Sequence, residues 1–177
     1  MRLIAFFLLF CSAAPAALIR FEPAARVVPP GSVDVPVDVI VNLDSGESLL
    51  GFDLDLVIVG TGYLPGTPFP AIDPLFTPVA GVDGDGFAGL FFGPPPSVPA
   101  GPSEVRIATF AFTFPGSGFV GLAVQASGLG EELSGLDGPL AFVSQTAVIG
   151  TPEPAAGALV GGALLLLGIV RMRRQRR

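Results

Sequence analysis

Glycine and proline interrupt this chain at close intervals, with 24 Gly and 19 Pro in 177 residues. Glycine loses much conformational entropy in a helix, and proline removes a backbone donor and clashes with the preceding turn. No segment between the two termini combines helical periodicity with uninterrupted length. Long soluble helices are therefore disfavoured, and we expect turn-rich β structure.

Alternation of apolar and polar side chains indicates the positions of several strands. From Val33 to Val41, valines occupy every second position, the period of a strand with one buried face. Residues 52–58 repeat this pattern. Pro36 cannot donate to a sheet ladder, so we expect an edge strand or a bulge at that point. Further strands are expected at Val105–Phe114, Phe119–Gln125 and Leu140–Ile149, whereas residues 60–100 give no strand prediction.

Several short strands separated by Gly/Pro turns predict an all-β fold, an antiparallel β-sandwich over residues 18–150. Three stretches of this body resemble cohesin-like domains of exported bacterial proteins, which are jelly-roll sandwiches. They are Gly31–Val37 (GSVDVPV), Gly51–Leu56 (GFDLDL) and Ala108–Phe114 (ATFAFTF). The resemblance implies a binding or structural role, and it does not require that the partner be a dockerin.

Several chemically useful residue types are absent. The chain has no His, Lys or Trp, and its one cysteine is Cys11. Without His it lacks the usual general base near neutral pH and the commonest transition-metal ligand. Its serines have no His or Lys to activate them as nucleophiles. We therefore expect a non-catalytic protein with no catalytic residues, no cofactor and no metal site.

The body of the chain is strongly acidic. Residues 18–153 contain fifteen acidic side chains against three arginines, a net charge of −12. Such a surface repels nucleic acid and anionic lipid headgroups. We therefore expect no nucleic-acid partner, and the arginines at the C-terminus need a different explanation.

Two neighbouring aspartates suggest an alternative function. Asp53 and Asp55 lie on one face of an expected strand, with side chains about 7 Å apart. Paired carboxylates at comparable separations catalyse glycoside hydrolysis. The alternative is therefore an enzyme acting on envelope polysaccharide through Asp53, Asp55 or Glu104. Alternation with Phe52 and Leu54 instead places both aspartates on the solvent side, away from a cleft that could shift their pKa values.

A glycine-rich segment invites two further interpretations. Gly84–Gly89 fits G-x-G-x-x-G, but a dinucleotide site needs a following helix, and three prolines come soon after. A hairpin or loop is favoured. Asp83 and Asp85 could share a calcium ion, although the other ligands of an EF-hand loop are missing. A solvated turn is favoured, with a calcium-stabilised carbohydrate- or protein-binding module as an alternative.

The N-terminus has the features of a secretory signal. Arg2 precedes the apolar run Leu3–Phe10, and small residues follow at Ala14–Ala16. We expect a signal peptide over residues 1–17, with signal peptidase cleaving after Ala16 or Ala17. The apolar run is too short to span a membrane. A lipoprotein signal at Cys11 is the alternative, although bulky Phe10 fits it poorly.

The C-terminus has the features of a short membrane segment. The apolar run Ala155–Val170 would form a helix of about 24 Å, shorter than the usual span of about 20 residues. Arginines whose long side chains snorkel to the headgroups can compensate for the short apolar run. Arginines also favour the cytoplasmic side of a membrane, so the acidic body is expected on the other side. The basic cluster consists of Arg171, Arg173, Arg174, Arg176 and Arg177. It makes a transmembrane helix, at about residues 155–170, a better prediction than a buried core helix.

Residues 151–177 combine Pro152, Glu153 and Pro154 with the apolar segment and the basic cluster. This order resembles the PEP-CTERM sorting signal of Gram-negative bacteria. The resemblance implies processing by an inner-membrane exosortase and a link to exopolysaccharide. The alternative is a stiff linker before a permanent anchor. We expect an exported protein that faces the periplasm from the inner membrane and then reaches the cell surface or matrix, where it acts structurally or adhesively with exopolysaccharide or matrix proteins.

Overall fold

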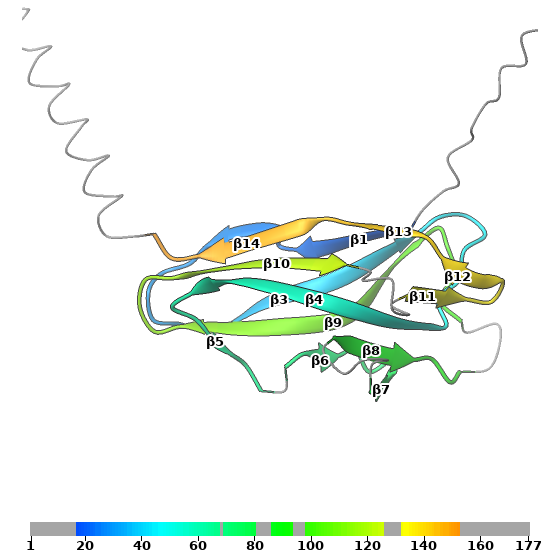
Figure 1. The fold of residues 1–177 in the computed structure, drawn as a ribbon, viewed down its shortest axis with the longest axis horizontal. Coiled ribbons are helices and arrows are strands. Elements are labelled where there is room, and N and C mark those ends of the chain that lie inside the picture. The colour runs from blue at the N-terminus through cyan, green and yellow to red at the C-terminus, as the bar shows by residue number, and fades with distance from the viewer. Residues whose placement is uncertain (1–16, 68, 81–85, 94–97, 126–131, 153–177) are drawn as a thin grey trace, which may run out of the picture.

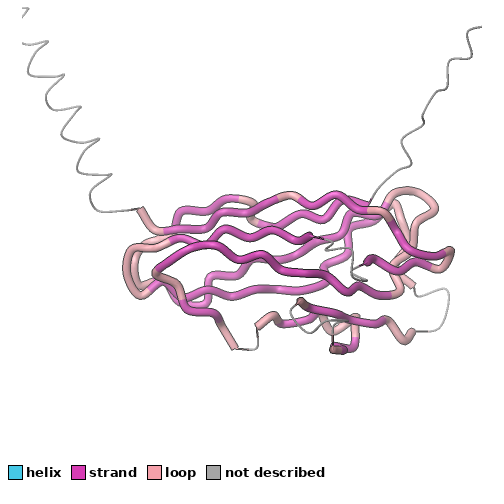
Figure 2. Tube along the Cα trace, in the orientation of Figure 1, coloured by secondary structure: helices cyan, strands magenta, loops and turns pink. Residues whose placement is uncertain are grey.

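The computed structural model describes residues 17–67, 69–80, 86–93, 98–125 and 132–152. All regular structure in these residues is β-strand, as Figure 2 shows. The all-β prediction is thus confirmed for this part of the chain. The expected signal helix and membrane helix lie outside it. Within the described ranges, no helix has the length and apolarity needed to cross a membrane.

One layer is a six-stranded sheet whose longest members are β3 (Ser32–Leu43) and β9 (Ser103–Phe114). These two strands pair antiparallel over most of their length, and β1 (Ala17–Glu22) pairs with the other side of β3. The strand order is β13-β1-β3-β9-β5, and β6 also pairs with β9. The shorter members are β5 (Leu64–Pro65), β6 (Ala71–Ile72) and β13 (Phe142–Ser144).

The second layer is an eight-stranded sheet built around β4 (Gly51–Thr61) and β10 (Phe119–Gln125). Its order is β12-β11-β4-β10-β14-β2, while β8 pairs with both β4 and β7. The remaining members are β2 (Ala25–Val27), β7 (Thr77–Val79), β8 (Phe87–Leu90), β11 (Glu132–Gly135), β12 (Gly138–Leu140) and β14 (Thr146–Gly150). The two sheets lie face to face and form a β-sandwich (Figure 1).

The core between the sheets is filled by inward-facing residues of the long strands. Phe110, Phe112 and Phe114 of β9 are completely buried. The ring of Phe110 contacts Phe69 at 5.2 Å and Phe87 at 5.5 Å between centroids, in edge-to-face geometry. The alternation read from the sequence therefore specifies which side of β9 is buried.

Four of the predicted strands are confirmed with small changes of boundary. They are β3, β4, β9 and β10, and β10 has the predicted bounds Phe119–Gln125. The region without a strand prediction contributes the four short strands β5 to β8. Their brevity explains why no periodic pattern identified them.

The edge position expected from Pro36 is wrong for β3 as a whole, because β3 lies between β1 and β9. The last pair that β1 makes is Glu22 with Asp38, so at Pro36 the strand pairs with β9 alone. The register also shifts between Ser32 and Val35, where Asp34 has a φ of 50°. Pro36 is thus accommodated just after a bulge and beyond the end of β1.

The prediction of a single strand at Leu140–Ile149 is wrong, because the chain there forms the end of β12 and then β13 and β14. β13 joins the six-stranded sheet beside β1, and β14 joins the eight-stranded sheet beside β10. The chain crosses between the layers at Gln145. The β1–β13 and β14–β2 pairs are parallel, so the sandwich is not wholly antiparallel.

The described chain enters and leaves the sandwich at opposite ends (Figure 1). Ala17 begins β1, is fully buried and donates its backbone N–H to the Ala141 carbonyl at 2.9 Å. At the other end, Thr151 follows β14 and bonds to the turn between β9 and β10. The folded body therefore includes one residue before and at least one residue beyond the predicted range 18–150.

Candidate functional site

The outer side of the eight-stranded sheet carries an apolar surface, which we call the valine face. It consists of Val57 and Val59 on β4, Gly121 and Ala123 on β10, and Thr146 and Val148 on β14. The strand register places these residues in two rows across the sheet. One row is Val59–Gly121–Val148, and the other is Val57–Ala123–Thr146.

The two small residues of β10 make the valine face concave. Val59 and Val148 are each more than half exposed, whereas Gly121 between them is buried. A hollow of about 180 Å³ follows the middle strand. A Cβ atom added to Gly121 would lie 2.9 Å from Cγ2 of Val59, so a larger residue would fill the hollow. The face is therefore a shallow trough between two apolar ridges.

The chemistry of the valine face is that of a contact surface. Its six residues include no charged group, and the hydroxyl of Thr146 is the only polar side-chain group among them. When a partner covers exposed apolar surface of this kind, the free energy of the system falls, which favours binding. An apolar face of this composition is suited to binding.

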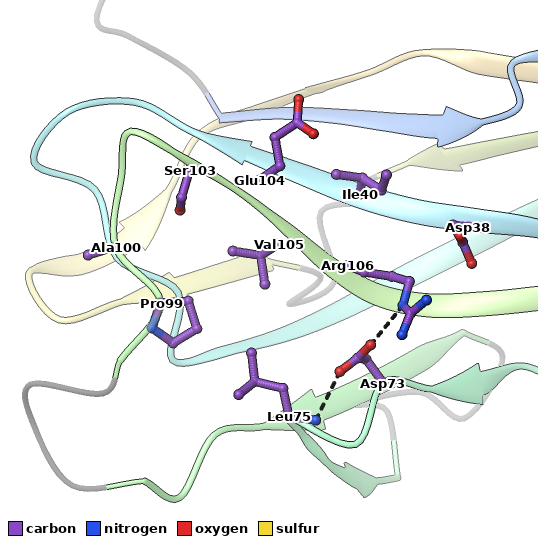
Figure 3. Close-up of a pocket in the computed structure, with 10 residues that line it drawn as sticks. All are labelled: Asp38, Ile40, Asp73, Leu75, Pro99, Ala100, Ser103, Glu104, Val105 and Arg106. Atoms are coloured by element: carbon purple, nitrogen blue, oxygen red, sulfur yellow. Dashed lines mark hydrogen bonds and ion pairs between the residues drawn. The ribbon is translucent and has the colours of Figure 1, made fainter.

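A larger hollow of about 630 Å³ lies on the outer side of the six-stranded sheet, and Figure 3 shows its lining. Strands β3 and β9 form its floor, and residues 73–75 and 99–100 form its walls. We call it the acidic groove. The lining residues are Asp38, Ile40, Asp73, Leu75, Pro99, Ala100, Ser103, Glu104, Val105 and Arg106.

The three carboxylates of the acidic groove hold structural bonds. Asp73 accepts from Arg106 Nε at 2.8 Å and from the Leu75 backbone N–H at 3.0 Å (Figure 3). The bond to Asp73 raises the pKa of the Arg106 guanidinium above its ordinary value. Asp38 accepts from the hydroxyl of Thr109. The Asp73–Arg106 contact attaches the segment around Asp73 to β9, and the Asp38–Thr109 contact joins β3 to β9.

Glu104 belongs to a separate ion-pair network at the rim of the groove. Arg20 on β1 donates to Glu104 at 2.8 Å and to Glu22 at 2.9 Å. The hydrogen bond to Glu22 is the main cause of a raised pKa at Arg20. The network bridges β1 and β9 across β3, which accounts for Glu104 without a catalytic role.

The acids proposed for the alternative enzyme do not meet in one pocket. Asp53 and Asp55 are on β4 in the eight-stranded sheet, while Glu104 lines the acidic groove on the other sheet. Asp53 and Asp55 lie on the outer side of β4, opposite buried Phe52 and Leu54, as the alternation predicted, but both are half-buried and not fully exposed. β4 is a central strand with β8 and β11 beside Asp53 and β10 beside Asp55, and these neighbours reduce the access of water.

The glycine-rich segment enters a strand. Gly86 precedes β8, and Gly89 lies within it, so the described part of the segment leads into sheet. This agrees with the hairpin or loop interpretation. Asp83 and Asp85 lie outside the described residues. Among the residues that are described, no group of three or more acidic side chains is arranged to hold a metal ion.

The predicted sorting residues fall mostly outside the described chain. Pro152 is described and exposed, and Ala17 begins β1. The others lie outside the described residues: Ala16, Glu153, Pro154, Arg171, Arg173, Arg174, Arg176 and Arg177.

Sequence reasoning missed the valine face, although a signal was present. Residues 56–59 (LVIV) and 119–124 (FVGLAV) are apolar at every position. A strand with one solvated face alternates, so an unbroken run indicates that both faces are apolar. One face of each run packs in the core, and the other forms the valine face.

Comparison with known proteins identifies the fold. No protein-family model matches the chain, and no curated protein sequence matches it. Among solved structures, the seventh ScaB type I cohesin from Pseudobacteroides cellulosolvens is similar, with 14% identity and a TM-score of 0.56 over 78% of this chain and 93% of that chain. A non-cellulosomal cohesin from the hyperthermophilic archaeon Archaeoglobus fulgidus matches with 13% identity and a TM-score of 0.50, over 81% and 96% of the two chains.

A third similar structure is the third ScaB cohesin of R. flavefaciens in complex with a group 1 dockerin. It has 16% identity and a TM-score of 0.50 over 80% of this chain and 99% of that chain. At these identities the likeness concerns the fold. The cohesin-like resemblance is confirmed at that level, because the described body has the fold of cohesin domains.

Proposed function

We propose that this protein is a non-catalytic binding module of the cell envelope or extracellular matrix, and that the valine face binds its partner. The observation that carries this proposal is the uncharged trough between Val59 and Val148 on an outer sheet face. A folded body with a net charge this negative has many acidic residues available for its surface. An apolar outer face on such an acidic body therefore indicates a surface that a partner covers.

The chemistry of the trough favours a protein partner over a polysaccharide. A sugar chain is rich in hydroxyl groups, and burying them without hydrogen-bond partners is costly. The valine face offers few such partners. A protein segment with an apolar side chain can fill the hollow beside Gly121. Association with exopolysaccharide would then be indirect, through a matrix protein.

The fold is compatible with this role. In the R. flavefaciens structure, a domain of this fold is in complex with another protein, a dockerin. The present proposal concerns protein binding in general and names no dockerin.

We further propose that the protein is exported and sorted by its terminal segments. The signal is removed after Ala16, because Ala17 is buried in β1 and its N–H is bonded to Ala141. An exosortase then processes the tail near Pro152, which is exposed beside the folded body. The mature body reaches the cell surface or the matrix, where its role is adhesive or structural.

Photo-crosslinking tests the binding surface. A photoreactive amino acid is placed at Thr146 on the valine face or, as a control, at exposed Glu22 on the other sheet. In cells that produce the protein, we expect a discrete protein adduct from position 146 and none from position 22. Val59→Asp should reduce that adduct at least about tenfold, the effect of about 1.4 kcal/mol. Equal adducts from both positions would rule out the valine face.

Truncation tests the sorting. The deletion should begin at Glu153, because Thr151 is buried and bonded to the β9–β10 turn. Loss of residues 153–177 should move the protein from the membrane fraction to the periplasm. An unchanged distribution between membrane, medium and matrix would contradict the sorting proposal.

A further inference from the structure

The chain leaves the sandwich from a fixed point. The Thr151 N–H donates to the Gly118 carbonyl at 2.8 Å, and the Gly118 N–H donates to Oγ1 of Thr151 at 2.6 Å. Val28 donates to the Gly150 carbonyl at 2.9 Å. The C-terminal segment therefore starts beside the β9–β10 turn, at the end of the sandwich opposite to the entry of β1.

Exposed apolar side chains gather around this exit. Val27 pairs with Gly150, and Phe119 pairs with the same residue from the other side of β14. On the six-stranded sheet, Leu64 pairs with Thr113, whose hydroxyl accepts from the N–H of Asp34, next to Val33. The exposed fractions are 78% for Val27, 69% for Val33, 57% for Leu64 and 48% for Phe119. We call these four residues and the turn 115–118 the exit surface.

Charged residues, unlike exposed apolar ones, are scarce around the exit. The segments at this end are residues 24–35, 59–66, 111–121 and 147–152, and they contain Arg26 and Asp34 as their charged residues. Near the other end lie Asp44, Glu47 and Asp137. The exit surface is therefore almost neutral, whereas the body as a whole is acidic.

The spacing to the apolar segment is short. Two residues, Glu153 and Pro154, separate Pro152 from the first residue of the apolar run at Ala155. Three fully extended steps span at most about 11 Å. The headgroup layer on each side of a bilayer is about 5–8 Å thick. If residues 155–170 lie in a membrane, the exit surface has to reach the lipid headgroups.

We propose that the exit surface rests on the lipid headgroup layer while the tail is membrane-inserted, so that the sandwich stands on this end. The inference rests on the proposed membrane insertion of the tail. The apolar side chains of the exit surface and its lack of net charge make the contact with lipid favourable, while the acidic residues of the body stay farther from anionic lipid. The valine face then stands at the side of the molecule, open to a partner, and the processing motif is held at headgroup level.

Fluorescence quenching in vesicles tests this orientation. The mature chain, residues 17–177, contains no cysteine. It carries one new cysteine, either Ser117→Cys at the exit surface or Ser45→Cys near the other end. Both serines are exposed, and the twelve residues of β3 separate these ends by roughly 40 Å. Each cysteine is labelled with a fluorophore, and the chain is reconstituted into phosphatidylcholine vesicles that contain headgroup-spin-labelled lipid.

We expect the label at position 117 to be quenched at least about fivefold more than the label at position 45, since the headgroup layer is only about 5–8 Å thick. Val33→Asp with Leu64→Asp should reduce the quenching at position 117 without loss of vesicle flotation. The matched control is Leu136→Asp with Val143→Asp, two exposed apolar residues away from the exit surface. This control should leave the quenching unchanged.

The outcomes separate the two proposals. Flotation with equal quenching at both positions would overturn the orientation and leave the membrane insertion intact. A chain that does not float would overturn the insertion and the orientation together. If the unlabelled Ser117→Cys variant forms disulfide-linked dimers in the vesicles and the labelled variant is not quenched by lipid, the exit surface contacts a second copy, which would also overturn the proposal.

Discussion

Substitution of Thr151 tests how firmly the folded body holds the start of its C-terminal segment. The residue is 8% exposed, and its hydroxyl accepts a hydrogen bond from the Gly118 N–H. The same hydroxyl lies 3.2 Å from the Gly118 carbonyl and 3.3 Å from the Gly116 carbonyl, to either of which it can donate. Thr151→Val keeps the shape of the side chain but leaves the half-buried Gly118 N–H without this partner.

The expected cost follows from that unsatisfied donor. A buried polar group that loses its partner destabilises a protein by about 1–3 kcal/mol. For a body of this size, the melting temperature should fall by roughly 3–10 °C. The measurement is urea and thermal unfolding of residues 17–152. Thr151→Ser retains the hydroxyl and should recover most of the loss, whereas Thr146→Val at an exposed position of β14 should change the stability by less than about 0.5 kcal/mol.

A second readout connects this site to the exit surface. If Thr151→Val releases the chain exit, the contrast in lipid quenching between positions 117 and 45 should shrink in the mature chain of residues 17–177. A Thr151→Val variant as stable as the parent would show that water replaces the hydroxyl at Gly118. That result would refute the argument that the exit is fixed by buried hydrogen bonds.

Three further predictions concern other parts of the molecule. Phe110→Ala removes a fully buried ring that contacts two other phenylalanines, and it should lower the free energy of unfolding by about 3–5 kcal/mol in urea titrations. Asp73→Asn weakens an ion pair whose arginine side chain is 52% exposed and whose aspartate side chain is 15% exposed, so about 1 kcal/mol should be lost, and added salt should reduce the difference from the parent. Mass spectrometry of the exported protein should find Ala17 as its first residue, and a mature chain that begins at Leu18 would contradict the role given to the buried N-terminus of β1.

The long strands could be predicted because their information is local. In β3, β9 and the first half of β4, residues alternate with a period of two, and the buried side follows directly from that alternation. The short strands of residues 60–100 have no such repeat, since two to four residues cannot establish a period. The prediction for residues 140–149 failed for a different reason. Its composition suits a strand throughout, and the crossing between sheets at Gln145 depends on which partners lie beside each half.

From the amino-acid sequence alone one can derive the all-β class, the absence of a His-based catalytic centre, and two terminal segments that predict export and membrane insertion. Composition and short-range pattern are sufficient for these conclusions. The tertiary structure alone decided that Asp53 and Asp55 lie away from Glu104, and that Gly121 lies between two valine ridges. It also decided that Val27, Val33, Leu64 and Phe119 surround one chain exit. These residues are far apart in the sequence, and strand order and register bring them together, because side chains on neighbouring strands meet only when the ladder hydrogen bonds align their positions.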